Sequence, residues 1–118
     1  MTDITLWHNP KCSKSREALA LILEAGFEPR IVEYLKTPPT RDDLAALVAA
    51  GIAVRELLRS KEDCYAELGL DDPTLTDDEL LDALQANPAL LNRPVARTPL
   101  GARVCRPPEV VREILPAT

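Results

Sequence analysis

The sequence predicts an α/β fold with one four-stranded mixed sheet, in which a βαβ half and a ββα half flank a helical insertion. Two strand-like segments flank a helical pattern near the start of the chain, and two more flank a turn near its end. Between them, residues 40–91 carry helix caps and helical apolar spacing. The length of 118 residues fits a single domain that covers positions 1–118.

The βαβ half comes first along the chain. Residues 3–7 (DITLW) are rich in β-branched and aromatic side chains, and this strand is expected to break at 8–10 (HNP). Residues 13–25 have helical apolar spacing, and Gly26 follows as a helix stop. The apolar face consists of Ala18, Leu19, Ile22 and Leu23. Residues 30–34 (RIVEY) predict a second strand, parallel to the first.

The insertion is predicted from its caps. Thr40 follows two prolines and is a suitable N-cap for a helix that runs to Ala50 and stops at Gly51. Short helical turns are expected at 54–59 and 64–68. Thr76 and Glu79 have the spacing of a capping box, which opens a helix that runs to about Ala86.

The ββα half closes the chain. Residues 94–97 and 102–105 predict a hairpin around a turn at 98–101, and Pro107 suits the first turn of a last helix that runs to Leu115. The order of all these elements is that of a thioredoxin-like architecture with a large helical insertion.

Charge is unevenly distributed along this acidic chain, whose formal net charge is −5. Residues 61–82 hold nine carboxylates and one lysine, whereas residues 83–118 hold five arginines and two glutamates. The acidic balance argues against a dedicated nucleic-acid binder. Arginines gathered in one cleft would suit a small anion. The alternative is that they are scattered over a solvated face.

Cysteine usage argues against a disulfide framework. The three cysteines, Cys12, Cys64 and Cys105, contain no Cys-x-x-Cys pair, and a metal site is not expected because His8 is the only histidine. The start, Met1–Asp3, lacks the features of a secretory leader, and no apolar run is long enough to span a membrane. We therefore expect a cytoplasmic protein.

The candidate chemistry lies at the first strand-to-helix turn. Cys12 precedes the first helix, where unpaired backbone N–H groups favour a thiolate and an anion. Nearby Lys11, Lys14 and Arg16 could lower the pKa of this thiol further, as could His8. The alternative is that Cys12 is a small buried apolar residue. His8 could pair with the thiolate, orient the loop or be purely structural. Cys64, among carboxylates, and Cys105, at a strand end, are interpreted as packed residues.

The segment His8–Arg16 (HNPKCSKSR) resembles the HNPxCxxSR signature of the glutaredoxin-dependent, ArsC-like arsenate reductases. The similarity continues in segments 34–39, 54–59, 92–95 and 98–109. The combination covers nearly the whole chain and is highly specific. Because longer members of that family carry a further tail, a chain that ends at Thr118 resembles the short subgroup.

This resemblance implies an enzyme that reduces arsenate to arsenite with glutathione as co-substrate and glutaredoxin as partner, without a bound cofactor or metal. By position, Cys12 matches the nucleophile, and His8 matches the residue associated with its activation. Pro94 matches the proline that is cis beside the active site of thioredoxin-like folds. The arginines that surround the arsenic oxyanion correspond to Arg59, Arg93 and Arg106.

Two rival functions stay open at this point. The first is a general thiol/disulfide oxidoreductase that acts on glutathione mixed disulfides. The second is a non-enzymatic regulator of the Spx type that binds a protein partner. The sequence Cys12–Ser15 (CSKS) lacks the second cysteine of thioredoxins and of Spx-type regulators, and the matched arginines favour an oxyanion enzyme over both rivals.

Overall fold

The computed structural model describes residues 3–116, so Met1 and Thr2 of the predicted leaderless start, and residues 117–118, lie outside it. Its centre is a four-stranded sheet in the order β2-β1-β3-β4. The strands are β1 (Thr5–His8), β2 (Arg30–Glu33), β3 (Val95–Thr98) and β4 (Gly101–Val104). β1 pairs in parallel with β2, and the other two pairings are antiparallel. This is the predicted thioredoxin-like fold.

Alternation along β1 sends neighbouring side chains into two separate cores. Leu6 pairs with Ala96 of β3, and both are fully buried under α1 (Ser13–Glu24) and η3 (Pro108–Ile114). Trp7 pairs with Val95, and both join the core that the inserted helices cover. Because side chains on a strand alternate between its faces, this register puts α1 and η3 on one side of the sheet and the inserted helices on the other.

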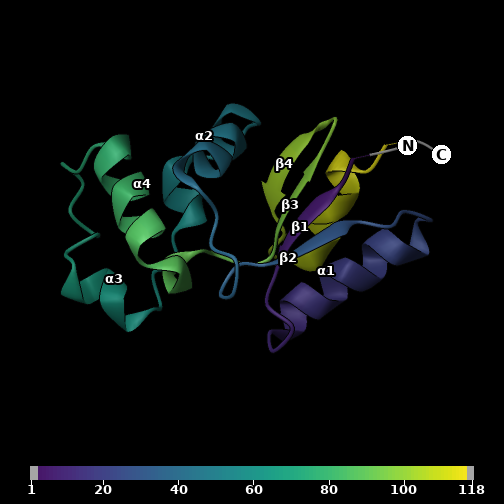
Figure 1. Ribbon diagram of the computed structural model, residues 1–118, viewed down its shortest axis with the longest axis horizontal. Helices are drawn as coiled ribbons and strands as arrows, with labels where there is room; N and C mark the ends of the chain where they lie inside the picture. The colour runs from purple at the N-terminus through teal and green to yellow at the C-terminus, as the bar shows by residue number, and fades with distance from the viewer. Residues whose placement is uncertain (1–2, 117–118) are drawn as a thin grey trace.

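The insertion forms a helical layer at one end of the molecule, with α1 on the opposite side of the sheet (Figure 1). Its elements are α2 (Arg41–Ala49), η1 (Val54–Leu57), α3 (Asp63–Glu67), α4 (Asp77–Ala86) and η2 (Pro88–Leu90). Thr40 caps α2 and Thr76 caps α4, each through a complete capping box. No helix among residues 3–116 is long and apolar enough to cross a membrane.

Several element boundaries differ from the sequence prediction. β1 continues through His8 because this residue still pairs with Glu33 of β2. The hairpin loop shrinks to two residues because Thr98 pairs with Gly101, whose φ of 144° a side chain would rarely allow. The last helix is a 3-10 helix that begins at Pro108, and Pro107 occupies its N-cap position. Residues 54–57 also form a 3-10 turn.

Candidate active site

The loop between β1 and α1 presents Cys12 at the N-terminus of a helix. Asn9 shapes this loop, because its carbonyl accepts from Cys12 N–H at 2.9 Å and its side-chain oxygen accepts from Lys11 N–H at 3.0 Å. Cys12 is the N-cap residue of α1, in an extended conformation. The side chain therefore lies where the first backbone N–H groups of the helix are unpaired.

These surroundings favour the thiolate of Cys12. Burial raises the pKa of the thiol, but the backbone N–H groups of Ser15 and Lys14 and the Arg93 guanidinium outweigh it. The pKa of Cys12 therefore lies below its ordinary value. Since the thiolate is the nucleophilic form of cysteine, the lowered pKa makes this residue more reactive at a given pH than an unperturbed cysteine.

The cation that acts on Cys12 is remote in sequence. Lys11 and Lys14 line the cavity beside the thiol, as their positions suggested, but the Arg16 side chain donates to the Pro10 carbonyl at 2.8 Å. Arg93, which precedes β3, is the charged side chain that lowers the pKa of the thiol. From local sequence alone, the cations expected to lower the pKa of Cys12 were its neighbours along the chain instead.

A cavity of about 390 Å³ brings the thiol and the three candidate arginines together. Its lining consists of Asn9, Lys11, Cys12, Ser13, Lys14, Arg59, Arg93 and Arg106. The Arg93 side chain is 14% exposed and that of Arg59 is 24% exposed, so both are well ordered by packing. Arg97 and Arg112 are exposed and lie elsewhere, on β3 and η3.

Backbone pairing explains how residues so far apart converge. Arg59 N–H donates to the Leu90 carbonyl at 2.7 Å, and Asn92 N–H donates to the Leu57 carbonyl at 2.8 Å. This short antiparallel contact holds Arg59 next to the segment that leads into Arg93. The Arg93–Pro94 peptide bond is cis, and the Arg106 side chain donates to the Arg93 carbonyl at 2.9 Å.

His8 contacts the thiol loop through Ser15. Nδ1 of the buried His8 ring lies 2.6 Å from the Ser15 hydroxyl, which also accepts from Asn9 N–H at 3.0 Å. Burial is the main cause that lowers the pKa of His8, and Arg16 adds to it although Glu33 opposes it. The ring is thus neutral near pH 7 and fixes Ser15, whose N–H stabilises the Cys12 thiolate.

Two further residues of the site were missed from the sequence. One oxygen of Glu62, Oε1, lies 3.3 Å from Arg93 Nη1 and 3.6 Å from Arg59 Nε. Tyr34 is fully buried beside Arg93, Asn9 and Cys12, and burial raises the pKa of its hydroxyl. In the sequence, Glu62 is one of many carboxylates in the acidic segment 61–82, and Tyr34 ends a predicted strand, so neither residue indicates a functional site. The three-residue spacing of Arg59 and Glu62 is the one local feature of the sequence that indicates an ion pair between them.

The other cysteines are packed residues. Cys64 contacts the core under the insertion. Cys105 is completely buried in the core beneath α1, and burial raises the pKa of its thiol to about 12. Both are in agreement with their interpretation from the sequence. Cys12 is therefore the one cysteine among residues 3–116 that combines access to the cavity with a lowered pKa.

The arrangement can bind a small anion and attack its central atom. Guanidinium groups orient the oxygens of an oxyanion through paired hydrogen bonds, and helix N–H groups add partial positive charge. The same charges reduce the repulsion between a thiolate and an anionic substrate. No group of three or more His, Cys, Asp or Glu side chains within residues 3–116 is arranged to hold a metal ion.

Comparison with known proteins identifies the family. The model of the ArsC family matches residues 7–114, which is most of the chain. The chain belongs to the ArsC family. It is 54% identical over 116 residues to the arsenate reductase of Rhizobium meliloti (strain 1021), a match that covers 98% of this chain and 83% of that relative.

Two other relatives of this ArsC-family protein match it in length as well. It is 46% identical to the uncharacterized protein YfgD of Escherichia coli (strain K12), over 96% of this chain and 97% of YfgD. The solved structure of an arsenate reductase from Vibrio cholerae superposes with a TM-score of 0.90 at 44% identity, and covers 97% of this chain and 98% of that one.

Proposed function

We propose that this protein is an arsenate reductase that uses the Cys12 thiolate as nucleophile. The observation that carries the proposal is the shared cavity, in which the low-pKa thiol faces Arg59, Arg93 and Arg106. The names of the relatives from Rhizobium meliloti and Vibrio cholerae agree with this activity. The cavity chemistry supplies a physical reason for it, because arsenate is a small tetrahedral oxyanion.

The proposed reaction begins with attack of Cys12 sulfur on arsenic. A sulfur–arsenic bond forms and one arsenate oxygen leaves as water. Glutathione sulfur then bonds to arsenic and a second oxygen leaves as water. The glutaredoxin thiolate attacks the glutathione sulfur, so the bond between this sulfur and arsenic breaks and its electron pair stays on arsenic. Water then cleaves the remaining bond between arsenic and the Cys12 sulfur. Arsenic(V) gains two electrons and becomes arsenic(III), while two external thiols lose two electrons and form one disulfide. Arsenite leaves and the Cys12 thiol is regenerated. The proposal involves no bound metal or organic cofactor, and glutathione acts as a co-substrate.

Within this proposal, the three arginines bind the oxyanion and His8 is a positioning residue that acts through Ser15. Its hydrogen bond to the Ser15 hydroxyl supports the loop-orienting role over direct pairing with the thiol. Pro94 shapes the backbone beside Arg93. Three free cysteines and a glutathione-dependent reaction suit the reducing cytoplasm, where we place the protein.

The test is NADPH oxidation coupled through glutathione reductase, with glutathione and glutaredoxin, in the presence and absence of arsenate. We expect arsenate-dependent turnover that Cys12→Ser abolishes and Cys64→Ser leaves nearly unchanged. Arsenate-independent reduction of a model mixed disulfide, without arsenate turnover, would instead identify a general thiol oxidoreductase. Capture of a large protein partner without any turnover would identify a regulator.

A further inference from the structure

Glu62 is an acidic residue in contact with two of the three arginines of an anion cavity. Its Oε1 atom lies 3.3 Å from Arg93 Nη1 and 3.6 Å from Arg59 Nε. The Glu62 side chain is only 29% exposed, so this carboxylate is held at the site rather than solvated freely. It touches both guanidinium groups but does not itself line the cavity with Cys12.

The carboxylate reduces the positive charge that the cavity offers to a ligand. Three arginines and two lysines line the cavity. Two negative groups offset part of their positive charge: the Cys12 thiolate, which lines the cavity, and the Glu62 carboxylate, which contacts two of the arginines. Glu62 also accepts a hydrogen bond from Arg93 Nη1, whereas its contact with Arg59 Nε at 3.6 Å is an ion pair only. A buried Arg93 nitrogen, Nε, has no hydrogen-bond partner among residues 3–116.

The lengths of these contacts decide which effect of Glu62 is larger. Strong charge-assisted N–H···O bonds measure about 2.7–2.9 Å, and both contacts of Glu62 are longer. The carboxylate therefore holds the arginine forks weakly in place. Its negative charge, in contrast, acts on any anion in the cavity irrespective of bond geometry, and the repulsion doubles when the ligand charge doubles.

We propose that Glu62 is a specificity-determining residue that weakens oxyanion binding in this cavity and disfavours dianions relative to monoanions of the same shape. This inference rests on the proposed function, since it takes the cavity to be an oxyanion site. In that reaction the effect of Glu62 is to raise the KM for arsenate, which is partly a dianion at neutral pH, while the chemical step at Cys12 is retained.

The experiment measures protection of Cys12 from iodoacetamide by sulfate, a tetrahedral dianion, and by perchlorate, a tetrahedral monoanion, at constant ionic strength. The readout is the anion concentration that gives half-protection, because this value does not depend on the intrinsic reactivity of the thiol. Glu62→Gln is compared with the wild type and with Glu67→Gln. The control removes the same charge from Glu67, the exposed last residue of α3, the short helix whose N-cap residue is Glu62.

In Glu62→Gln, we expect the half-protecting concentration of sulfate to fall roughly three- to tenfold and that of perchlorate by about the square root of that factor. Glu67→Gln should match the wild type. Unchanged or weaker sulfate protection in Glu62→Gln would overturn the inference, as would equal factors for both anions or no protection in any variant. Unchanged thermal unfolding of Glu62→Gln verifies that the variant is folded.

The KM for arsenate in the coupled assay separates this inference from the proposed function. If the wild type turns arsenate over, Glu62→Gln should lower the KM by a factor similar to that for sulfate. If the wild type shows no arsenate turnover but the sulfate shift is present, the reductase proposal fails and the charge-selective role of Glu62 stands. Turnover with an unchanged KM in Glu62→Gln would overturn the role of Glu62 alone.

Discussion

Cys12 owes its lowered pKa to both local and distant groups, and each contribution has a measurable consequence. We expect its rate of alkylation by iodoacetamide to rise with pH around a midpoint below that of an unperturbed cysteine. Arg93→Ala should raise that midpoint, because the guanidinium favours the thiolate. Arg97→Ala is the control, since Arg97 lies on β3 away from the cavity.

Peptide mapping after a brief pulse at pH 6.5 distinguishes the three cysteines. Cys12 should carry nearly all the label, because burial raises the pKa of Cys105 to about 12 and Cys64 packs against a core. Equal labelling of the three would contradict the account of the thiol. The same pKa shift stabilises the fold above the unfolded-state pKa of Cys12, and this contribution is lost as the pH falls through the lowered folded-state pKa.

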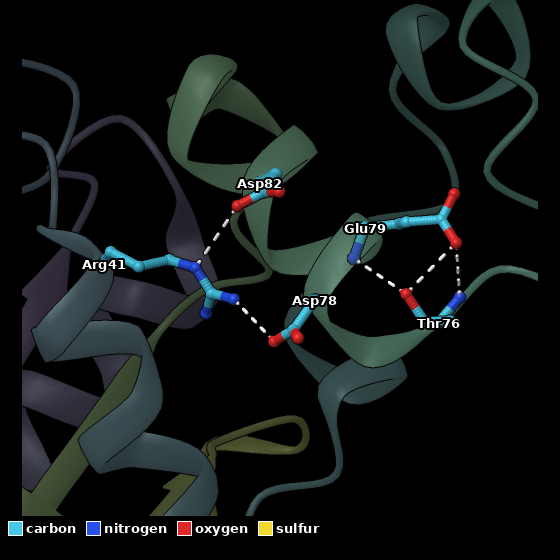
Figure 2. Close-up of polar contacts among 5 residues, drawn as sticks. All are labelled: Arg41, Thr76, Asp78, Glu79 and Asp82. Carbon is cyan, nitrogen blue, oxygen red and sulfur yellow. Dashed lines mark hydrogen bonds and ion pairs between the residues drawn. The ribbon is translucent and has the colours of Figure 1, made fainter.

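At the scale of the elements, we expect helix caps to contribute more stability than the ion pairs between helices. Figure 2 shows both for α4: Thr76 and Glu79 form the capping box, and Arg41 of α2 reaches Asp78 at 2.8 Å and Asp82 at 3.3 Å. The two aspartates are 88% and 72% exposed, so solvent screens these pairs strongly.

Thr76→Ala should lower the free energy of unfolding by about 1 kcal/mol, because it leaves the Glu79 N–H of α4 without its acceptor. Arg41→Ala should cost well under about 1 kcal/mol, since exposed ion pairs contribute little. Urea unfolding of the two variants and the wild type measures both losses. A larger loss in Arg41→Ala than in Thr76→Ala would contradict this ranking.

Helix caps and glycines made most elements predictable from the sequence. The boundaries that were predicted wrongly depend on hydrogen bonding between strands, which local sequence does not encode. Thr76 and Glu79 marked the start of α4 correctly because a capping box is encoded within four residues. The ends of β1 and of the hairpin were misplaced because His8 and Gly101 are assigned to strands by partners on neighbouring strands. The 3-10 form of η3 also has no local signal that distinguishes it from an α-helix.

At the scale of the molecule, the site arises from four separate segments, at residues 9–14, 59, 93 and 106, which only the fold brings together. The position of Cys12 at a helix start was predicted from its own neighbours. The convergence of Arg59, Arg93 and Arg106 was expected from family resemblance alone, since spacing along the chain does not encode it. The acidic contact of Glu62 depends on the pairing between residues 57–59 and 90–92, which the sequence pattern did not reveal.

We propose that the sheet and the insertion form one domain over residues 1–118. The two cores share the sheet, and the insertion is tied to β4 by the Ala102 N–H bond to the Ala50 carbonyl at 3.1 Å. Unfolding in urea should therefore be a single transition. Fluorescence of Trp7, the only tryptophan, and far-ultraviolet circular dichroism should give coincident curves. Separate midpoints would show two independently folding units.

The most direct measurement compares the catalytic efficiency toward arsenate, kcat/KM, of single alanine variants at two sets of arginines. Hydrogen bonds to charged groups contribute about 1.5–3 kcal/mol each, so alanine at 59, 93 or 106 should lower kcat/KM by roughly ten- to a hundredfold. Alanine at 97 or 112, outside the cavity, should change it little. If both sets lose activity alike, or neither does, the cavity around Cys12 is not the site where arsenate is bound and reduced.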